Sequence, residues 1–152
     1  MEKIASFTVN HKHLTQGMYT SRKDGDIVTY DLRFRRPNRE AVLSNAALHT
    51  IEHLMATVLR NGELAENVIY FGPMGCRTGF YLLLRNVNPA DAIRVTVNAL
   101  KAVSDWRGEI PGTTDAECGN YREHDLEAAK KEAAMMLDIL KDWTKEKLTY
   151  QS

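Results

Sequence analysis

Apolar and polar residues alternate along residues 27–34 of the sequence. Every second position carries a large apolar side chain: Val28, Tyr30, Leu32 and Phe34. The intervening positions carry Ile27, Thr29, Asp31 and Arg33. Successive side chains of a β-strand point to opposite faces, so the pattern predicts a strand with one buried face. Pro37 cannot donate a hydrogen bond to a neighbouring strand, and the strand therefore ends before it.

Three other segments repeat apolar residues at the spacing of an amphipathic helix. The first covers residues 46–60, and Ser44 or Asn45 can cap its start. The second begins at Asn88-Pro89, where a capping residue is followed by proline in the first helical position. The third runs over about residues 125–148. The sequence therefore predicts three amphipathic helices, each with one buried face.

Two further strands are predicted at residues 68–71 and 79–85, joined by a glycine-containing turn. Residues 109–123 have the composition of a loop, in which residues 109–111 are expected to add a short edge strand. Strands and helices mix without a regular β-α-β alternation. We therefore expect an α+β fold, an antiparallel sheet with helices packed mainly on one face. At 152 residues, the chain is expected to form a single domain over residues 1–152.

Composition narrows the class of protein. Hydrophobic residues make up 43% of the chain and charged residues 26%, as in ordinary globular domains. The 20 Lys and Arg residues balance the 20 Asp and Glu residues, so the charge offers no reason to expect nucleic acid or a membrane surface as partner. No stretch is apolar enough for a transmembrane helix, and the N-terminus lacks the pattern of a signal peptide. We expect a cytoplasmic protein.

The segment His49-Thr50-Ile51-Glu52-His53 is the clearest chemical signal. Residues four apart on a helix lie about 40° apart around its axis, so His49 and His53 project side by side. Two imidazoles placed in this way can bind one divalent cation. Glu52 faces the same side without having to bind the ion, which suits a carboxylate that accepts and returns a proton. The alternative is a solvated helix face that carries these residues by chance.

A third metal ligand must come from elsewhere in the chain. The candidates are His11, His13, His124, Cys76 and Cys118. A set of two histidines and one cysteine leaves the fourth position open for water or substrate, as in catalytic zinc sites. Both cysteines stand beside glycine, and in the reducing cytosol metal binding or catalysis is a better expectation than a disulfide. Spacing alone does not choose between the two cysteines.

The order and content of several sequence blocks resemble the S-ribosylhomocysteine lyase (LuxS) family. The most specific blocks are His49–Leu54 and Pro73–Tyr81. The others are Ser6-Phe7 with His11, Asp31–Phe34 with Pro37-Asn38, Cys118-Gly119, and His124–Glu127. Together they extend from residue 6 to about residue 130, so the resemblance covers nearly the whole chain.

The resemblance implies roles for individual residues. The positions that match the family's metal ligands are His49, His53 and Cys118. Those that match its catalytic residues are Glu52 and Cys76, and those that match its substrate contacts are Ser6, His11 and Arg33. The resemblance also implies Fe²⁺ as the metal, replaceable by Zn²⁺ or Co²⁺, and a homodimer with active sites at the subunit interface. The implied fold is a two-layer α/β sandwich similar to that of the H-x-x-E-H metallopeptidases.

The implied substrate is S-ribosylhomocysteine, in which the C5 of ribose is joined to the sulfur of homocysteine. A metal ion can polarise the oxygens of the sugar. Cys76 as a thiolate and Glu52 as a carboxylate can then carry protons while the carbonyl moves from C1 to C3. β-Elimination releases homocysteine and 4,5-dihydroxy-2,3-pentanedione, the precursor of autoinducer-2. The implied context is quorum sensing and the activated methyl cycle.

Four positions depart from the pattern that is frequent in the family: Asn10, Tyr70, Gly72 and Ala128. Tyr70 stands where aspartate is common, and Gly72 where serine is common. These changes affect the expected ribose contacts and the N-terminal segment that covers the substrate. The metal and catalytic positions are unchanged.

Two other functions are compatible with parts of the sequence. A zinc peptidase of the inverted H-x-x-E-H type would use Glu52 to activate water and a downstream residue such as Glu127 as ligand. It would not need either cysteine. A non-enzymatic, metal-stabilised binding module would instead need a fourth protein ligand that closes the coordination sphere.

Overall fold

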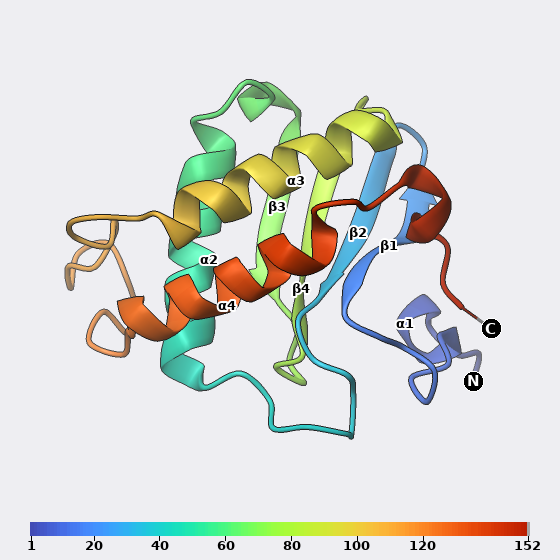
Figure 1. The fold of residues 1–152 in the computed structure, drawn as a ribbon, viewed down its shortest axis with the longest axis horizontal. Coiled ribbons are helices and arrows are strands. Elements are labelled where there is room, and N and C mark those ends of the chain that lie inside the picture. Colours follow the sequence, from blue (N-terminus) through green and yellow to red (C-terminus); the bar gives the residue numbers. More distant parts are fainter. Residues whose placement is uncertain (152) are drawn as a thin grey trace.

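The structure, a computed structural model that describes residues 1–151, consists of one sheet and three long helices in two layers (Figure 1). The strands are β1 (Gly17–Asp24), β2 (Ile27–Arg33), β3 (Val68–Pro73) and β4 (Gly79–Arg85). They are ordered β1-β2-β4-β3, and each neighbouring pair is antiparallel. The predicted α+β class with an antiparallel sheet is confirmed.

Helices α2 (Asn45–Arg60), α3 (Pro89–Ser104) and α4 (Leu126–Leu140) cover one face of this sheet (Figure 1). Each begins at a side chain that accepts a backbone N–H of its first turn, and these caps are Ser44, Asn88 and Asp125. The apolar side of β2 faces the helices, and Tyr30, Leu32 and Phe34 are almost fully buried there. The strand at residues 27–33 and the first two helices therefore form where the hydrophobic pattern predicts them.

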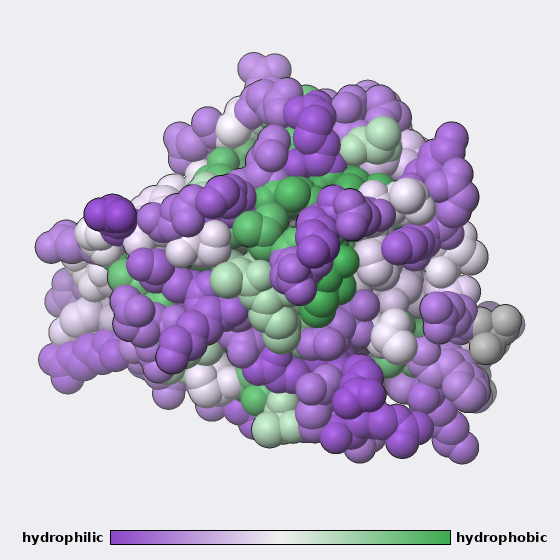
Figure 2. Space-filling view, viewed as in Figure 1, coloured by the Kyte–Doolittle hydropathy of each residue, from purple (hydrophilic) through white to green (hydrophobic). Residues whose placement is uncertain are grey.

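The outer side of the helix layer is polar. Figure 2 shows hydrophilic residues over most of this face, with hydrophobic residues gathered over the strip between α3 and α4. Within residues 1–151, no helix combines the length and the apolar composition that crossing a bilayer requires. The remaining elements are short: α1 (Ala5–Thr8) and the 3-10 helices η1 (Ala65–Asn67) and η2 (Lys145–Leu148).

Two predictions about the second half of the chain are wrong. Residues 109–111 form no strand, because the carbonyl of Pro111 accepts a hydrogen bond from the His53 ring instead of pairing with the sheet. The last helix ends at Leu140 and not near Leu148. Beyond it the chain turns toward β1, where the indole N–H of Trp143 donates to the carbonyl of Met18 at 2.9 Å.

Strand β1 was not expected from the sequence. Met18 and Tyr19 are adjacent and point to opposite faces, yet both are buried. The helix layer covers Met18, whereas the rings of Trp143 and Tyr150 cover Tyr19. A bulge between Thr20 and Arg22 interrupts the pairing with β2 as well. A strand buried on both sides for these reasons lacks the alternation by which strands are recognised.

Candidate metal centre and substrate site

Helix α2 presents His49 and His53 on the side that faces the loop of residues 105–125. The Sγ atom of Cys118, in that loop, lies 3.3 Å from Nε2 of His49 and 3.7 Å from Nε2 of His53. The ligating atoms of His49, His53, Cys118 and His124 all lie within 4.8 Å of one another. The ligating atoms of the two histidines and the cysteine that the resemblance implies as metal ligands therefore lie close together.

Backbone carbonyls fix the tautomers of the two α2 histidines. The Nδ1–H of His49 donates to the carbonyl oxygen of Glu123, and the Nδ1–H of His53 donates to that of Pro111, both at 2.9 Å. A carbonyl can only accept, so the proton must be on Nδ1 and the Nε2 lone pair is left for the cluster. The same outer partners orient histidine ligands in known metal sites.

The loop reaches His53 closely because of a glycine. Gly112 has a φ of +74°, and a Cβ atom there would lie 3.3 Å from Nδ1 of His53. Any larger residue at this position would be strained and would crowd the ring. The carbonyl of Pro111 can therefore come within hydrogen-bonding distance of the imidazole.

His124 is a fourth member of the cluster. Its ring stacks on that of His49 with the centroids 4.0 Å apart, and its Nδ1 lies 2.9 Å from Oγ1 of Thr50. The Thr50 hydroxyl donates to the carbonyl of Ala46, so it accepts the Nδ1–H of His124 and also the backbone N–H of Asp125. The Nε2 lone pair therefore faces the cluster, and Nε2 is buried with no hydrogen-bond partner among the described residues.

The charge state of His124 agrees with this geometry. Burial and the neighbouring His49 and His53 lower the pKa of His124 to about 4. The ring is neutral at pH 7 and can donate its lone pair to a cation. The sequence leaves His124 as one of several candidate ligands, because the position of its ring in the cluster depends on the buried Thr50 hydroxyl. Three imidazole nitrogens and one thiolate form a donor set that suits Zn²⁺, Fe²⁺ or Co²⁺, and a cation would satisfy the unpartnered Nε2.

Glu52 lies beside this cluster on the wall of an open hollow of about 530 Å³. The hollow is also lined by His53, Tyr70 and the loop residues Pro111 and Gly112. The sequence-based expectation that Glu52 faces the same region as the histidines agrees with this position. Glu127, the ligand that a peptidase would require, is exposed in the first turn of α4 and outside the cluster.

The other four residues nominated from the sequence line a second hollow, of about 350 Å³. They are Ser6, His11, Arg33 and Cys76. Cys76 is a free, exposed cysteine, and its Sγ atom lies 3.1 Å from Oγ1 of Thr78. Arg77, next to it in sequence, has a φ of +60° and directs its guanidinium toward the carbonyl of Leu43 at 3.4 Å.

Arg33 is held on the side of β2 that faces away from the helices. It is only 3% exposed, and its guanidinium donates to both carboxylate oxygens of Asp31, at 3.0 and 2.6 Å. A third bond goes to Oγ1 of Thr78 at 2.8 Å. Burial opposes the charged form, but the hydrogen bonds and negative charge of Asp31 outweigh it and raise the pKa of Arg33. Arg33 is thus a fixed positive charge beside Cys76.

The two hollows have no lining residue in common. Tyr70 lines the hollow that contains Glu52, and its ring lies over Gly72, where a Cβ atom would be 1.9 Å from the phenol oxygen. The two departures from the family pattern at positions 70 and 72 therefore fit each other, since the tyrosine ring needs the space that glycine leaves.

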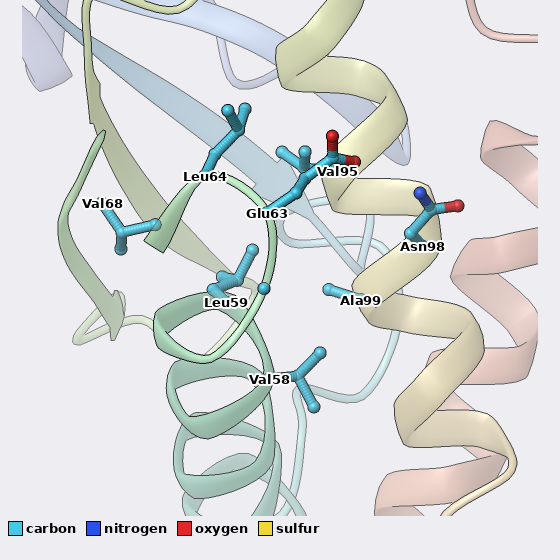
Figure 3. Close-up of a pocket in the computed structure, with 9 residues that line it drawn as sticks. Val58, Leu59, Glu63, Leu64, Val68, Val95, Asn98 and Ala99 are labelled. Atoms are coloured by element: carbon cyan, nitrogen blue, oxygen red, sulfur yellow. The ribbon is translucent and has the colours of Figure 1, made fainter. Parts of the chain in front are cut away.

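A third hollow, of about 190 Å³, lies between α2, the turn of residues 62–64 and α3 (Figure 3). Its lining is mostly aliphatic, with Val58, Leu59, Leu64 and Val95 around it. Glu63, at its rim, is paired with Arg94. This hollow has no nucleophile or metal-ligating cluster and is separate from the residues nominated for chemistry.

Comparisons with known proteins agree with the family resemblance. The family model described as S-Ribosylhomocysteinase (LuxS) matches residues 4–147. The chain is 46% identical over 156 residues to an S-ribosylhomocysteine lyase of Borreliella afzelii, covering 99% of each protein. It is 49% identical over 152 residues to one of Clostridium acetobutylicum, covering 93% of this chain and 96% of that protein. A relative of the same name from Phocaeicola vulgatus is 45% identical over 157 residues, covering 99% and 98%.

Proposed function

Because the chain belongs to the S-ribosylhomocysteinase (LuxS) family, we propose that it cleaves the thioether of S-ribosylhomocysteine. The products are homocysteine and 4,5-dihydroxy-2,3-pentanedione, the precursor of autoinducer-2. The observation that carries the proposal is the convergence of His49, His53 and Cys118 within one cluster. The role in autoinducer synthesis and the activated methyl cycle, in the cytoplasm, is part of the same proposal.

The proposed metal ligands are His49, His53 and Cys118, with Fe²⁺ as the cofactor and Zn²⁺ or Co²⁺ as replacements. A bound divalent cation would polarise the carbonyl and hydroxyl oxygens of the sugar. The tautomers fixed by Glu123 and Pro111 direct both Nε2 lone pairs to this position before any ion arrives. Such preorganisation favours binding because the side chains need not be ordered at that moment.

The proton transfers are assigned to Cys76 and Glu52. Moving the carbonyl from C1 to C3 requires that a base remove a proton from one carbon and that an acid return one to its neighbour. Removal of the C4 proton then breaks the C5–S bond, and the electron pair leaves with sulfur as homocysteine thiolate. Cys76 is exposed to the hollow that the buried positive charge of Arg33 also lines. Ser6, His11 and Arg33 are the proposed substrate contacts.

The separation of the two hollows supports a homodimer with its active sites at the interface. One hollow has Glu52 and His53, the other has Cys76 and Arg33, and they share no lining residue. A second copy could bring its Cys76 hollow against the first copy's metal cluster. Apolar side chains beside these hollows are exposed in the single chain, among them Phe7 at 69% and Tyr70 at 49%. Burial of such residues would stabilise the dimer.

The proposal is tested by incubating the Fe²⁺- or Co²⁺-loaded protein with S-ribosylhomocysteine under anaerobic conditions and measuring free homocysteine thiol. We expect Glu52→Gln to bind substrate and to lose about 10²–10⁴-fold in turnover, the usual contribution of a positioned acid or base. Glu127→Gln is the matched control, an exposed carboxylate outside the cluster, and should turn over as the unmodified protein does. Absence of thiol release from the metal-loaded protein would contradict the proposal that it is a lyase.

One observation favours a second candidate, a metal-stabilised module without catalysis. His124 offers the fourth donor that a closed, structural site requires, since its Nε2 faces the cluster and has no other partner among the described residues. Such a module would bind metal through four protein ligands and release no thiol. The exposed Cys76 and the buried Arg33 beside it have no role in a module of this kind, so we prefer the lyase.

A further inference from the structure

A continuous row of hydrogen bonds joins Cys76 to the C-terminal segment. The phenol of Tyr150 donates to Oδ2 of Asp31 at 2.6 Å, and Asp31 is bonded twice by Arg33. Arg33 donates to Oγ1 of Thr78 at 2.8 Å, and Thr78 lies 3.1 Å from Sγ of Cys76. We propose that Tyr150 is a positioning residue that supports the reactive Cys76 thiolate through this row, the Tyr150 network.

The chemistry of the groups fixes the direction of each bond. A carboxylate only accepts, so Asp31 accepts the hydrogen bonds that Tyr150 and Arg33 donate. A guanidinium only donates, so the Thr78 oxygen accepts from Arg33 and its own proton is free for the sulfur of Cys76. Charge-assisted bonds of this kind are stronger than neutral ones. Every donor in the Tyr150 network therefore favours negative charge at Asp31 or at Cys76.

Tyr150 limits how far Asp31 cancels the charge of Arg33. When the phenol shares the negative charge of the carboxylate, Arg33 donates more strongly to the Thr78 oxygen, and the Thr78 hydroxyl in turn donates more strongly to the sulfur of Cys76. The phenol stays protonated, because burial and the charge of Asp31 raise the pKa of Tyr150 far above its ordinary value. Asp31 is fully buried and Thr78 is 4% exposed, so water screens these interactions little.

The position of the phenol is fixed by packing. The ring of Tyr150 stacks on that of Tyr19 with centroids 5.1 Å apart and an interplanar angle of 21°. Trp143 meets the edge of Tyr19 at 5.9 Å and is itself bonded to Met18. Replacement of Tyr150 by phenylalanine would keep this stack and remove only the donor.

The inference rests on the proposed role of Cys76, but its test needs no substrate. We would measure the rate of Cys76 alkylation by iodoacetamide in Tyr150→Phe from pH 6 to pH 10. The alkylation rate at pH 7 should fall about threefold, because less of the thiol is ionised. Near pH 10, well above the ordinary thiol pKa of about 8.5, the rate should equal that of the unmodified protein. A structural change that only alters access would change the rate equally at every pH.

Two further variants complete the experiment. Tyr30→Phe removes a phenol from β2, the strand of Asp31 and Arg33, but on the face that packs against the helices. This phenol is outside the Tyr150 network, so the pH profile of alkylation should not change. Thr78→Val breaks the network next to Cys76, so adding Tyr150→Phe to it should have little further effect. A Tyr150→Phe profile that matches the unmodified protein, or additive effects in the double variant, would overturn the inference. Absence of thiol release from the unmodified protein would instead count against the proposed function.

Discussion

The buried hydroxyl of Thr50 connects α2 to the segment that carries His124, and its removal is the most informative test of how the metal centre is built. Thr50 is fully buried. Its oxygen accepts from the backbone N–H of Asp125 and from Nδ1 of His124, both at 2.9 Å. Thr50→Val keeps the branched shape and the helical preference of the side chain but offers no acceptor.

The expected cost follows from the two donors that the substitution leaves without a partner. A buried donor left unsatisfied costs about 1–3 kcal/mol, and the Asp125 N–H, nearer the surface, costs less than the His124 ring. We therefore expect Thr50→Val to lower the free energy of unfolding by about 2–3 kcal/mol. In a domain of this size each kcal/mol lowers Tm by about 2–4 °C, so the total decrease is about 4–12 °C.

The assay is urea and thermal unfolding of chelator-treated protein, so that metal affinity does not enter. Thr96→Val is the matched control, because Thr96 is equally buried and donates to the carbonyl of Ala92 one turn earlier, but it has no bond to another element. Its loss should be below about 1 kcal/mol, the value of one ordinary hydrogen bond. Equal losses in the two variants would refute the assignment of Thr50 as the link between α2 and His124.

Elemental analysis should find that three alanine variants lose most of the bound metal: His49→Ala, His53→Ala and Cys118→Ala. Cys76→Ala should retain it, and the opposite result for the two cysteines would reverse the ligand assignment. Gly79→Ala should destabilise the fold by about 1–3 kcal/mol or more in chemical unfolding, because its Cβ atom would lie 2.2 Å from the backbone oxygen of Leu32. Gly75→Ala is the control for this variant, because a Cβ atom at position 75 has no other atom within 4 Å. It should change the free energy of unfolding by less than about 0.5 kcal/mol.

The parts of the fold that the sequence predicts well are those with local causes. Helix α2 starts at the Ser44 cap and α3 at the Asn88-Pro89 pair, as their residue types indicate. The large apolar residues of β2, Tyr30 and Leu32, are buried under the helices, as their spacing indicates. The end of α4 is tied to a distant contact, the hydrogen bond from Trp143 to Met18 of β1. No residue type near Leu140 indicates that the helix ends there.

In the candidate site, too, only the features with local causes can be predicted from the sequence. The pairing of His49 and His53 follows from helical geometry alone, whereas the choice between Cys76 and Cys118 depends on the path of a loop without regular structure. The burial of Arg33 could not be predicted from its strand either. Its guanidinium is paired with Asp31, which also accepts a hydrogen bond from Tyr150, 119 positions further along the chain.

The contact between the C-terminal segment and the first strands has a consequence for the order in which the protein is completed during synthesis. Tyr150 and Trp143 leave the ribosome after all four strands have been translated, and they contact residues near the start of the chain. Until then the Asp31–Arg33 pair lacks one of its donors and Tyr19 lacks its aromatic cover. The nascent sheet is therefore expected to pair before Tyr150 and Trp143 are available, so that Cys76 acquires these surroundings only after the sheet has formed.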